Sequence, residues 1–418
     1  MTDLPTSVVI ASHGRPGLLR RCLTGVSQLF HPDFEVIVVA DAAGLAAVAD
    51  LPFADAIKQV RSDEENLSAA RNLGIAEAAG EVVAFIDDDA VPEPTWLDRL
   101  SGAFADADVA AATGFVRARN GISFQWQAET VDRVGTSRPL PLDTAEPTVL
   151  TPRADRAIKT PGTNMAFRRG LLAALGGFDP ALRFYLDDAD LNMRLAEAGA
   201  LTAVVPLAQV HHAFAASSRR SAARAPRALD QIGASMAVYL RKHAPAGQHE
   251  LTRRSALLDQ RRRLLRHMQA GTLEPRDVRR LLREFSDGWA QGMRRPLDPL
   301  PKIARSGSDF RRFPSRPNAL SVLIPARSLD ARYALAEAQA RVARGEVATV
   351  IILSRTALYH RVTFDPEGYW VQRGGIWGRS DRAAPLIRPM RFASRVQAEC
   401  RRVAALRRLD CDAALHNG

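Results

Sequence analysis

One stretch constrains this chain more than any other: an apolar run that ends in three consecutive carboxylates. Residues 82–86 are apolar and β-rich, a pattern typical of a buried strand in a parallel sheet. The triplet Asp87–Asp89 follows at once, and Pro92 prevents the strand from continuing. Ligands of open α/β sheets bind at the carboxyl ends of the strands. The stretch therefore predicts either a ligand site at a sheet edge or an acidic surface turn.

The chemistry of the triplet favours the first of these alternatives. Three adjacent anions repel one another, and a bound divalent cation relieves that repulsion. Mg²⁺ in particular is usually held by one or two carboxylates together with the phosphates of a substrate. The triplet therefore predicts a metal site that serves a phosphate-bearing ligand.

Strands and helices alternate along the N-terminal part of the chain. The apolar runs at residues 7–11 and 34–40 read as strands, and helical patterns follow at residues 18–26 and 68–79. This alternation predicts βαβ units, a parallel sheet and right-handed crossovers. Nucleotide binding is a natural use of such a sheet but does not follow from it.

A second acidic cluster lies at residues 185–195, at the start of an expected helix. Carboxylates are favoured at a helix N-terminus by the dipole and the free N–H groups. Capping explains one acid there, but Asp187, Asp188 and Asp190 make three. Residues 162–167 read as a strand beside the acidic loop, and residues 132–157 as a flexible surface loop.

Composition places the chain among ordinary globular proteins. Its 418 residues are 46% hydrophobic and 25% charged, enough for two or three domains. Cys22, Cys400 and Cys411 lie far apart without metal-ligand spacing, which predicts reduced thiols and a cytoplasmic protein. The first apolar run is too short for a signal peptide, and no run reads as a membrane span.

The net charge of +11 is unevenly distributed. Residues 1–215 carry 18 Lys and Arg against 28 Asp and Glu, whereas residues 216–418 carry 39 against 18. A basic half indicates an anionic partner such as a membrane surface, a phosphorylated acceptor or nucleic acid, or else solvated helix faces. Aromatic residues make up only 6% and no nucleic-acid-binding module is recognisable, so we expect no nucleic acid partner.

The C-terminal half predicts several further segments. Residues 217–227 are polar and basic, as in a lid over the phosphates of a ligand. Two basic amphipathic helices are expected at residues 251–268 and 278–293, packed on their own domain or lying on an anionic membrane. The expected domains are residues 1–227 (catalytic), 228–295 (basic amphipathic helices), 296–318 (linker) and 319–418 (a small α/β domain of unknown role).

Taken together and in order, these motifs resemble a family 2 glycosyltransferase with the GT-A fold, over residues 7–215. The resemblance implies a Rossmann-like, mostly parallel sheet in an α/β N-terminal domain. It rests on Ser7–Leu23, Asn66–Gly80, the acidic loop with Pro92, Pro94, Trp96 and Leu97, Gly162–Phe178, and Asp187–Gly199. The sequence departs from the usual pattern of this family at two places. The acidic pair after the second strand is only half kept, as Ala40-Asp41, and Asn66 stands where a glycine is usual.

The resemblance also implies roles for individual residues. Asp188 stands at the position of the catalytic base. Asp89 is the expected metal ligand, with Asp87 beside it and His211 or His212 as a further ligand. The cofactor implied is Mg²⁺ or Mn²⁺. The residues expected to contact the donor are Ser12, Arg15, Asp41, Arg71, Asp87 and Asp88.

The function implied is inverting, metal-dependent transfer of a sugar from a nucleotide diphosphate donor, most simply a UDP-sugar. The acceptor expected is a saccharide or a lipid-linked molecule of the cell envelope or an exopolysaccharide. A cation neutralises the leaving diphosphate, and a base accepts the proton of the acceptor hydroxyl. The expected location is cytoplasmic, with peripheral contact to the inner face of the membrane. The alternative is a catalytically silent protein that binds sugar nucleotides or serves as a scaffold.

Overall fold

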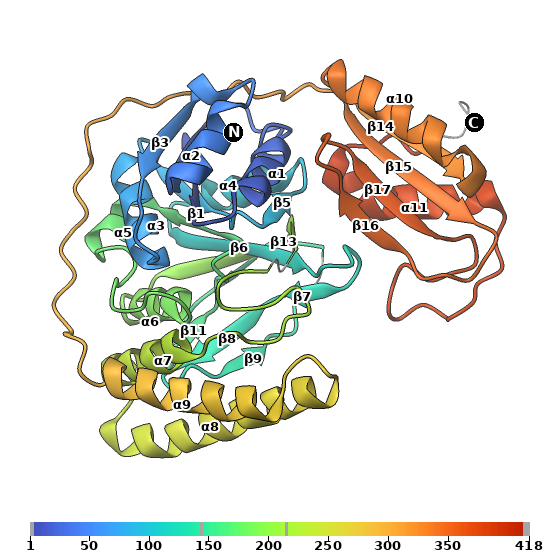
Figure 1. Cartoon of the computed structure of the whole chain (residues 1–418). Helices are drawn as coiled ribbons and strands as arrows, with labels where there is room; N and C mark the ends of the chain where they lie inside the picture. Colours follow the sequence, from blue (N-terminus) through green and yellow to red (C-terminus); the bar gives the residue numbers. More distant parts are fainter. Residues whose placement is uncertain (1–3, 143–144, 214–215, 413–418) are drawn as a thin grey trace.

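The computed structural model describes residues 4–142, 145–213 and 216–412. Figure 1 shows an α/β body around one long sheet, a layer of helices along one side of it, and a smaller α/β unit built from the C-terminal residues. The predicted fold class, a Rossmann-like N-terminal domain followed by helices and a small α/β domain, is confirmed.

The main sheet is mixed, and its N-terminal half is parallel. Its strand order is β10-β13-β6-β12-β4-β1-β2-β3, with β5 paired to β13 and β7 to β6. Neighbours among β4, β1, β2 and β3 run parallel, while β12 runs antiparallel to both β4 and β6. The strands are β1 Thr6–Ser12, β2 Phe34–Ala40, β3 Ile57–Arg61, β4 Val82–Phe85, β5 Ala90–Pro92, β6 Val109–Arg117, β7 Phe124–Trp126, β10 Thr148–Leu150, β12 Met165–Arg168 and β13 Leu201–His212.

Helices cover both faces of this sheet, which is why its central strands are apolar throughout. Alternation along β1 sends Val8 and Ile10 into one core and Val9 into the other. Helices α1, α2 and α4 pack on the first face, and α3, α5 and α6 on the second. Their bounds are α1 Pro16–Val26, α2 Ala42–Ala49, α3 Leu67–Glu77, α4 Trp96–Gly102, α5 Arg169–Ala174 and α6 Asp187–Glu197.

The segment expected to be a flexible surface loop, residues 132–157, contains short strands instead. β8 (Glu129–Asp132), β9 (Ser137–Pro139) and β11 (Arg156–Ile158) form a separate three-stranded sheet, and β10 joins the edge of the main sheet. Strands of three or four residues are too short to show a periodic pattern, so they cannot be predicted from the sequence pattern. Their core is built with α6 and α7.

Three helices follow the main sheet: α7 Asp230–His243, α8 Ala246–Gln269 and α9 Pro275–Gly292. The predicted apolar stripe of α9 packs against α7 so closely that a Cβ at Gly288 would lie 1.9 Å from the carbonyl oxygen of Asp230. Helix α8 packs on α9 and buries fully only Leu264. Among the helices that the structure describes, none is long and apolar enough to cross a membrane.

Residues 296–318, expected to form a linker, are packed against the body as a strap that runs along the edge of the main sheet (Figure 1). Phe313 is 1% exposed, and its ring stacks on Phe34 with centroids 5.2 Å apart. Its N–H donates to the carbonyl oxygen of Phe34 at 2.7 Å. Lys58 holds the strap through the hydroxyl of Ser308 at 3.1 Å. This segment therefore contributes to the N-terminal core.

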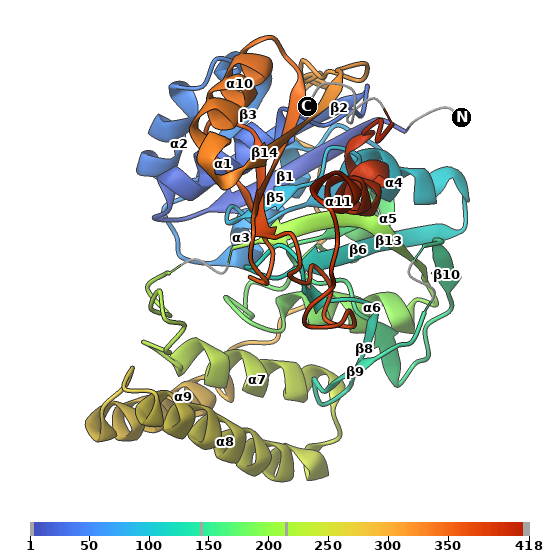
Figure 2. The ribbon, with the colours of Figure 1, turned by 90° about the vertical axis from the view of Figure 1, so that its right-hand side faces the viewer.

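The C-terminal unit is a four-stranded sheet of order β14-β15-β17-β16 with a helix on each side, in agreement with the small α/β domain expected there. Figure 2 shows α10 and α11 in front of α1, β5 and α4. The elements are β14 Ser321–Arg327, α10 Ala331–Ala343, β15 Val347–Ser354, β16 Arg361–Phe364, β17 Trp370–Gly375 and α11 Phe392–Arg407.

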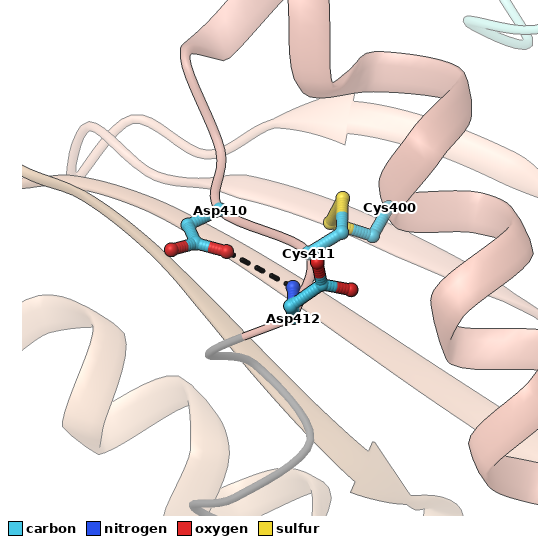
Figure 3. Close-up of a disulfide and its surroundings, with 4 residues drawn as sticks. All are labelled: Cys400, Asp410, Cys411 and Asp412. Atoms are coloured by element: carbon cyan, nitrogen blue, oxygen red, sulfur yellow. Dashed lines mark hydrogen bonds between the residues drawn. A yellow bond between two sulfur atoms is a disulfide. The ribbon is translucent and has the colours of Figure 1, made fainter.

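The expectation of reduced thiols is wrong for one pair of cysteines. Cys400, in α11, forms a disulfide with Cys411 (Figure 3). The chain reverses after α11 at Arg408, whose φ is +50°, and this turn returns Cys411 to the helix. The argument from cysteine usage to the cytoplasm therefore fails, whereas Cys22 is free and buried as expected.

Candidate functional site

The acidic triplet lies between β4 and β5, next to the end of β1. Asp88 is fully buried and accepts a hydrogen bond from the Ser12 hydroxyl at 2.7 Å. Arg15, at the start of α1, lies 2.6 Å from the other oxygen of Asp88. Burial raises the pKa of Asp88 to about 7, against the opposing effect of Arg15. The structure thus brings the predicted residues Ser12, Arg15 and Asp88 into one contact group.

A second group of side chains has the composition of a metal site. Asp87, Asp89 and His212 offer ligand atoms that all lie within 4.8 Å of one another. His212 Nε2 is 3.0 Å from Asp89 Oδ1, and its Nδ1 is 3.1 Å from Gln125 Oε1. A hydrogen bond from Nδ1 to Gln125 leaves the Nε2 lone pair directed at the carboxylates, as in metal sites whose second contacts orient the ligand.

His211, one of the two histidines expected as a further ligand, points elsewhere. β5 and β13 are antiparallel, with His212 opposite Ala90 and His211 opposite Val91. Because neighbouring side chains of a strand point to opposite faces, only one of the two histidines can reach the acidic cluster. His211 Nε2 instead lies 2.7 Å from Glu93, and burial lowers the pKa of His211 to about 4 despite that carboxylate. The histidine at the cluster is therefore His212.

A cavity of about 520 Å³ opens beside the triplet, at the carboxyl ends of β1 and β2. Ser12 and Arg15 line it on one side, and residues 217–220 of the basic segment line it on the other. Arg220 is 3.3 Å from Asp89, and Arg219 is 3.1 Å from Glu65. The segment predicted as a lid thus lies directly over the acidic cluster and the cavity.

Asp41 follows β2 and has a local structural partner for each oxygen. One oxygen caps α2 by accepting from the Gly44 N–H at 2.9 Å, and the other accepts from the Gly14 N–H at 2.8 Å. Gly14 has φ +68°, so the turn between β1 and α1 uses the backbone freedom of glycine. Asp41 thereby fixes the turn that carries Arg15, and it does not line the cavity.

Arg71 joins the two acidic clusters. Its guanidinium contacts Asp187 and lies 3.2 Å from Asp87, and it also donates to the carbonyl oxygen of Gly162 at 3.1 Å. A Cβ at Gly162 would lie 2.5 Å from this guanidinium, so a larger residue there would displace the Arg71 side chain. Burial raises the pKa of Asp187 although Arg71 opposes the shift. The predicted donor residue Arg71 is thus a buried bridge within the site.

Asp188 is half-buried, and among the residues that the structure describes it has no ion-pair partner, unlike Asp187 and Asp190. Its two oxygens accept from the backbone N–H groups of Gly162 at 3.2 Å and of Ala189 at 2.7 Å. The two residues that precede the acidic pair, Tyr185 and Leu186, both have positive φ, at 78° and 62°. Such strain in non-glycine residues concentrates at functional sites, and here it sets where α6 begins. The carboxylate of Asp188 is therefore held by backbone contacts rather than by an ion pair.

The third acid of this cluster, Asp190, has a structural role. It is fully buried and lies 2.6 Å from Lys242, 2.8 Å from Arg194 and 2.9 Å from His243. These contacts join α6 to α7, and they leave Asp187 and Asp188 as the acids of the site.

The C-terminal unit touches the back of the acidic loop through a buried ion pair. Glu93 follows β5 and is fully buried, and Arg407 of α11 is 1% exposed. Arg407 donates to both oxygens of Glu93, at 2.7 and 2.8 Å. Burial alone would raise the pKa of Glu93, but Arg407 and His211 hold it far below its ordinary value. Trp370 completes the contact, with its ring 4.7 Å from that of His211 and 4.1 Å from the Arg407 guanidinium.

Sequence reasoning did not single out several of these residues. Glu93, Arg407, Glu65 and Arg220 have no motif of their own, and each acquires its contact from the tertiary fold. For His212, the alternation of side chains along the strand would have separated it from His211, given the pairing of β5 with β13.

Comparison with known proteins gives one family and several relatives. The family Glycosyl transferase family 2 matches residues 7–175. A pre-mycofactocin glycosyltransferase of Mycobacterium tuberculosis is 29% identical over 216 residues, which cover 49% of this chain and 42% of that protein. An uncharacterized glycosyltransferase of Nostoc sp. is 28% identical over 180 residues, covering 42% and 54%. The chain thus spans about half the length of the curated relatives it matches.

Among solved structures, the chain is similar to a mannosyltransferase of Pyrobaculum calidifontis in complex with GDP-Man and Mn²⁺. It is 18% identical, covers 70% of this chain and 88% of its own, and has a TM-score of 0.42.

We predict that Arg407→Gln lowers the free energy of unfolding by about 3–5 kcal/mol, because it leaves the Glu93 carboxylate buried without its partner. The measurement is urea denaturation of the whole protein. The matched control is Arg408→Gln, next in the chain, whose half-exposed ion pair with Asp98 should be worth less than about 1 kcal/mol. A double variant, Glu93→Gln with Arg407→Gln, should recover part of the loss. Equal costs for the two single variants would contradict the prediction.

Proposed function

We propose, from the match of residues 7–175 to glycosyl transferase family 2, that the protein transfers a sugar from a nucleotide diphosphate donor to a hydroxyl acceptor. The donor proposed is a UDP-sugar, and the acceptor is a saccharide or a lipid-linked molecule of the cell envelope or an exopolysaccharide. Transfer is metal-dependent and inverts the anomeric centre.

The observation that carries this proposal is the convergence of Asp87, Asp89 and His212 beside the 520 Å³ cavity. Two carboxylates and one imidazole suit a divalent cation that leaves positions open for phosphate oxygens. The imidazole is a softer ligand than Mg²⁺ usually takes, which favours Mn²⁺ between the two ions proposed. When bound, the cation supplies the positive charge that stabilises a leaving diphosphate.

The residues around the cavity can bind and orient the donor. Arg15 contacts Asp88 and Arg220 contacts Asp89, and guanidinium groups match phosphate oxygens in charge and geometry. Asn66, Glu64 and Ser62 line the part of the cavity away from the triplet, where the nucleoside is placed. Asp41 acts indirectly in this proposal, because it fixes the turn that carries Arg15.

Asp188 is proposed as the general base that accepts the proton of the acceptor hydroxyl. Its carboxylate is half-buried and fixed by two backbone N–H groups, without an ion pair that would hold its charge elsewhere. Attack from the side opposite the leaving diphosphate inverts the anomeric carbon. The rival function is a catalytically silent protein that binds sugar nucleotides, and only a transfer assay separates the two.

We predict that Mn²⁺ binding releases protons and strengthens as the pH rises from about 6 to 8. The pKa of Asp88 is about 7, so this carboxyl is largely protonated below that pH, and a cation beside it favours the charged form. Affinity should therefore fall as the pH drops through 7 and level off above it. Calorimetry in buffers of different ionisation enthalpy counts the protons released.

Asp88→Asn is the matched variant for this measurement, because it removes the titrating group and keeps the shape. It should abolish the proton release near pH 7. Asp89→Ala should abolish Mn²⁺ binding and metal-dependent nucleotide binding in a folded protein. Unchanged metal affinity in Asp89→Ala would exclude Asp89 as a ligand.

We predict that Asp188→Asn lowers the transfer rate by ~10²–10⁴-fold, as expected for loss of a positioned base. Donor affinity should change little, because Asp188 lies outside the Asp87–Asp89–His212 cluster. The measurements are transfer rate and nucleotide affinity at fixed Mn²⁺. Glu197→Gln, at the exposed end of the same helix, is the control and should leave both unchanged. A variant that transfers sugar at the wild-type rate would refute the role of Asp188.

We also propose that α8 contacts an anionic membrane. Leu251 and Leu258 are 73% and 51% exposed, lie two turns apart on one face, and have Arg254 and Arg262 beside them. Full-length protein should sediment with phosphatidylglycerol vesicles at low salt and detach as salt shortens the screening length to about 8–10 Å. Leu251→Gln with Leu258→Gln should weaken binding, and no sedimentation at low salt would refute the contact.

A further inference from the structure

A second cavity, of about 280 Å³, lies between the N-terminal body and the C-terminal unit. The N–H of Val362 in β16 donates to the carbonyl oxygen of Asn120 at 2.9 Å, so the two parts touch at its rim. The donor cavity is a separate space, and the two share only Ala216 among their lining residues. The walls come from α1, from the turn after β6, from the end of β13 and from β16.

The charged side chains that line this cavity all have one sign. Arg21 of α1, Arg119 of the turn and Arg361 of β16 line it, and no Asp or Glu is among its lining residues. Within the part of the chain that the structure describes, none of these three arginines forms an ion pair. The Nε of Arg21 is buried and has no hydrogen-bond partner. Arg119 donates only to the carbonyl oxygen of Ala222, at 3.3 Å.

Three unpaired guanidinium groups around one hollow specify the chemistry of a ligand. Arg119 and Arg361 are exposed and available to a ligand, whereas Arg21 is partly buried, and its buried Nε–H without an acceptor is costly until one is supplied. Guanidinium groups bind phosphate oxygens through paired, charge-assisted hydrogen bonds. The rest of the wall combines the apolar side chains of Val91, Val362 and Phe364 with His211, His212 and Thr363, and the volume is close to the lower limit of small-molecule sites.

We propose that this cavity binds the phosphate group of a small, partly apolar ligand, held by Arg21, Arg119 and Arg361. The site lies outside the donor cavity, although its lining includes His212 of the acidic cluster. Arg21 belongs to the N-terminal body and Arg361 to the C-terminal unit, so the ligand joins the two parts. His212 lines the same cavity and contacts Asp89, which places the bound phosphate next to the acidic cluster.

The test is calorimetric titration of the full-length protein, in metal-free buffer, with three probes. Inorganic phosphate and phenyl phosphate represent a soluble ligand, and monomeric dihexanoyl phosphatidylglycerol represents a lipid headgroup. The variants are Arg361→Gln and Arg21→Gln. Arg355→Gln, an exposed arginine of the same C-terminal unit outside the cavity, is the matched control. Arg220→Gln reports any binding in the donor cavity.

We expect saturable binding of at least one probe, weakened about tenfold or more by Arg361→Gln and by Arg21→Gln and unchanged in Arg355→Gln and Arg220→Gln. Binding of the phosphate probes identifies a soluble ligand, and binding of the lipid probe alone identifies a headgroup. Circular dichroism and an unchanged urea midpoint confirm that the variants are folded. The proposal is overturned if no probe binds, if binding survives both substitutions, or if only Arg220→Gln removes it.

Discussion

The buried ion pair between Glu93 and Arg407 is the contact on which the arrangement of this molecule depends. Glu93 follows β5, the short strand that begins directly after the acidic triplet, and β5 pairs with the end of β13 that carries His212. A carboxylate buried this deeply must keep its partner, because a lone buried charge is strongly destabilising. The C-terminal unit is thereby bound to the strand pair that presents both kinds of candidate ligand, and its position and that of the acidic cluster are fixed together.

The contact between Glu93 and Arg407 is also one of several ion pairs that join the basic half of the chain to the acidic half. The basic half meets the acidic half at several points: Arg220 lies against Asp89, Arg219 against Glu65, and Arg407 against Glu93. Part of the positive charge of residues 216–418 is therefore neutralised within the molecule.

The sequence predicts well the features that depend on local pattern. Burial on one or two faces produces the apolar patterns of β1, β2 and β4 and the apolar stripe of α9. The acidic triplet marks the sheet edge where the site forms. It does not predict contacts between distant residues. Arg407 and Glu93 are 314 positions apart, and neither belongs to a periodic pattern. The choice between His211 and His212 depends on the pairing of β13, which contains an irregularity between Val205 and Val210. The Cys400–Cys411 disulfide depends on a single left-handed residue after a helix.

The strap of residues 296–318 tethers the C-terminal unit closely to the N-terminal body. Phe313 is anchored in the N-terminal core, so only residues 314–320 separate that anchor from the first strand of the C-terminal unit. A tether this short keeps its ends at an effective concentration in the millimolar range. The interface around Glu93 can therefore stay formed even with an intrinsic affinity too weak to hold two separate chains together in dilute solution. Cleavage of the tether between Phe313 and Ser321 would convert a permanent contact into a concentration-dependent one without removing a single interfacial atom.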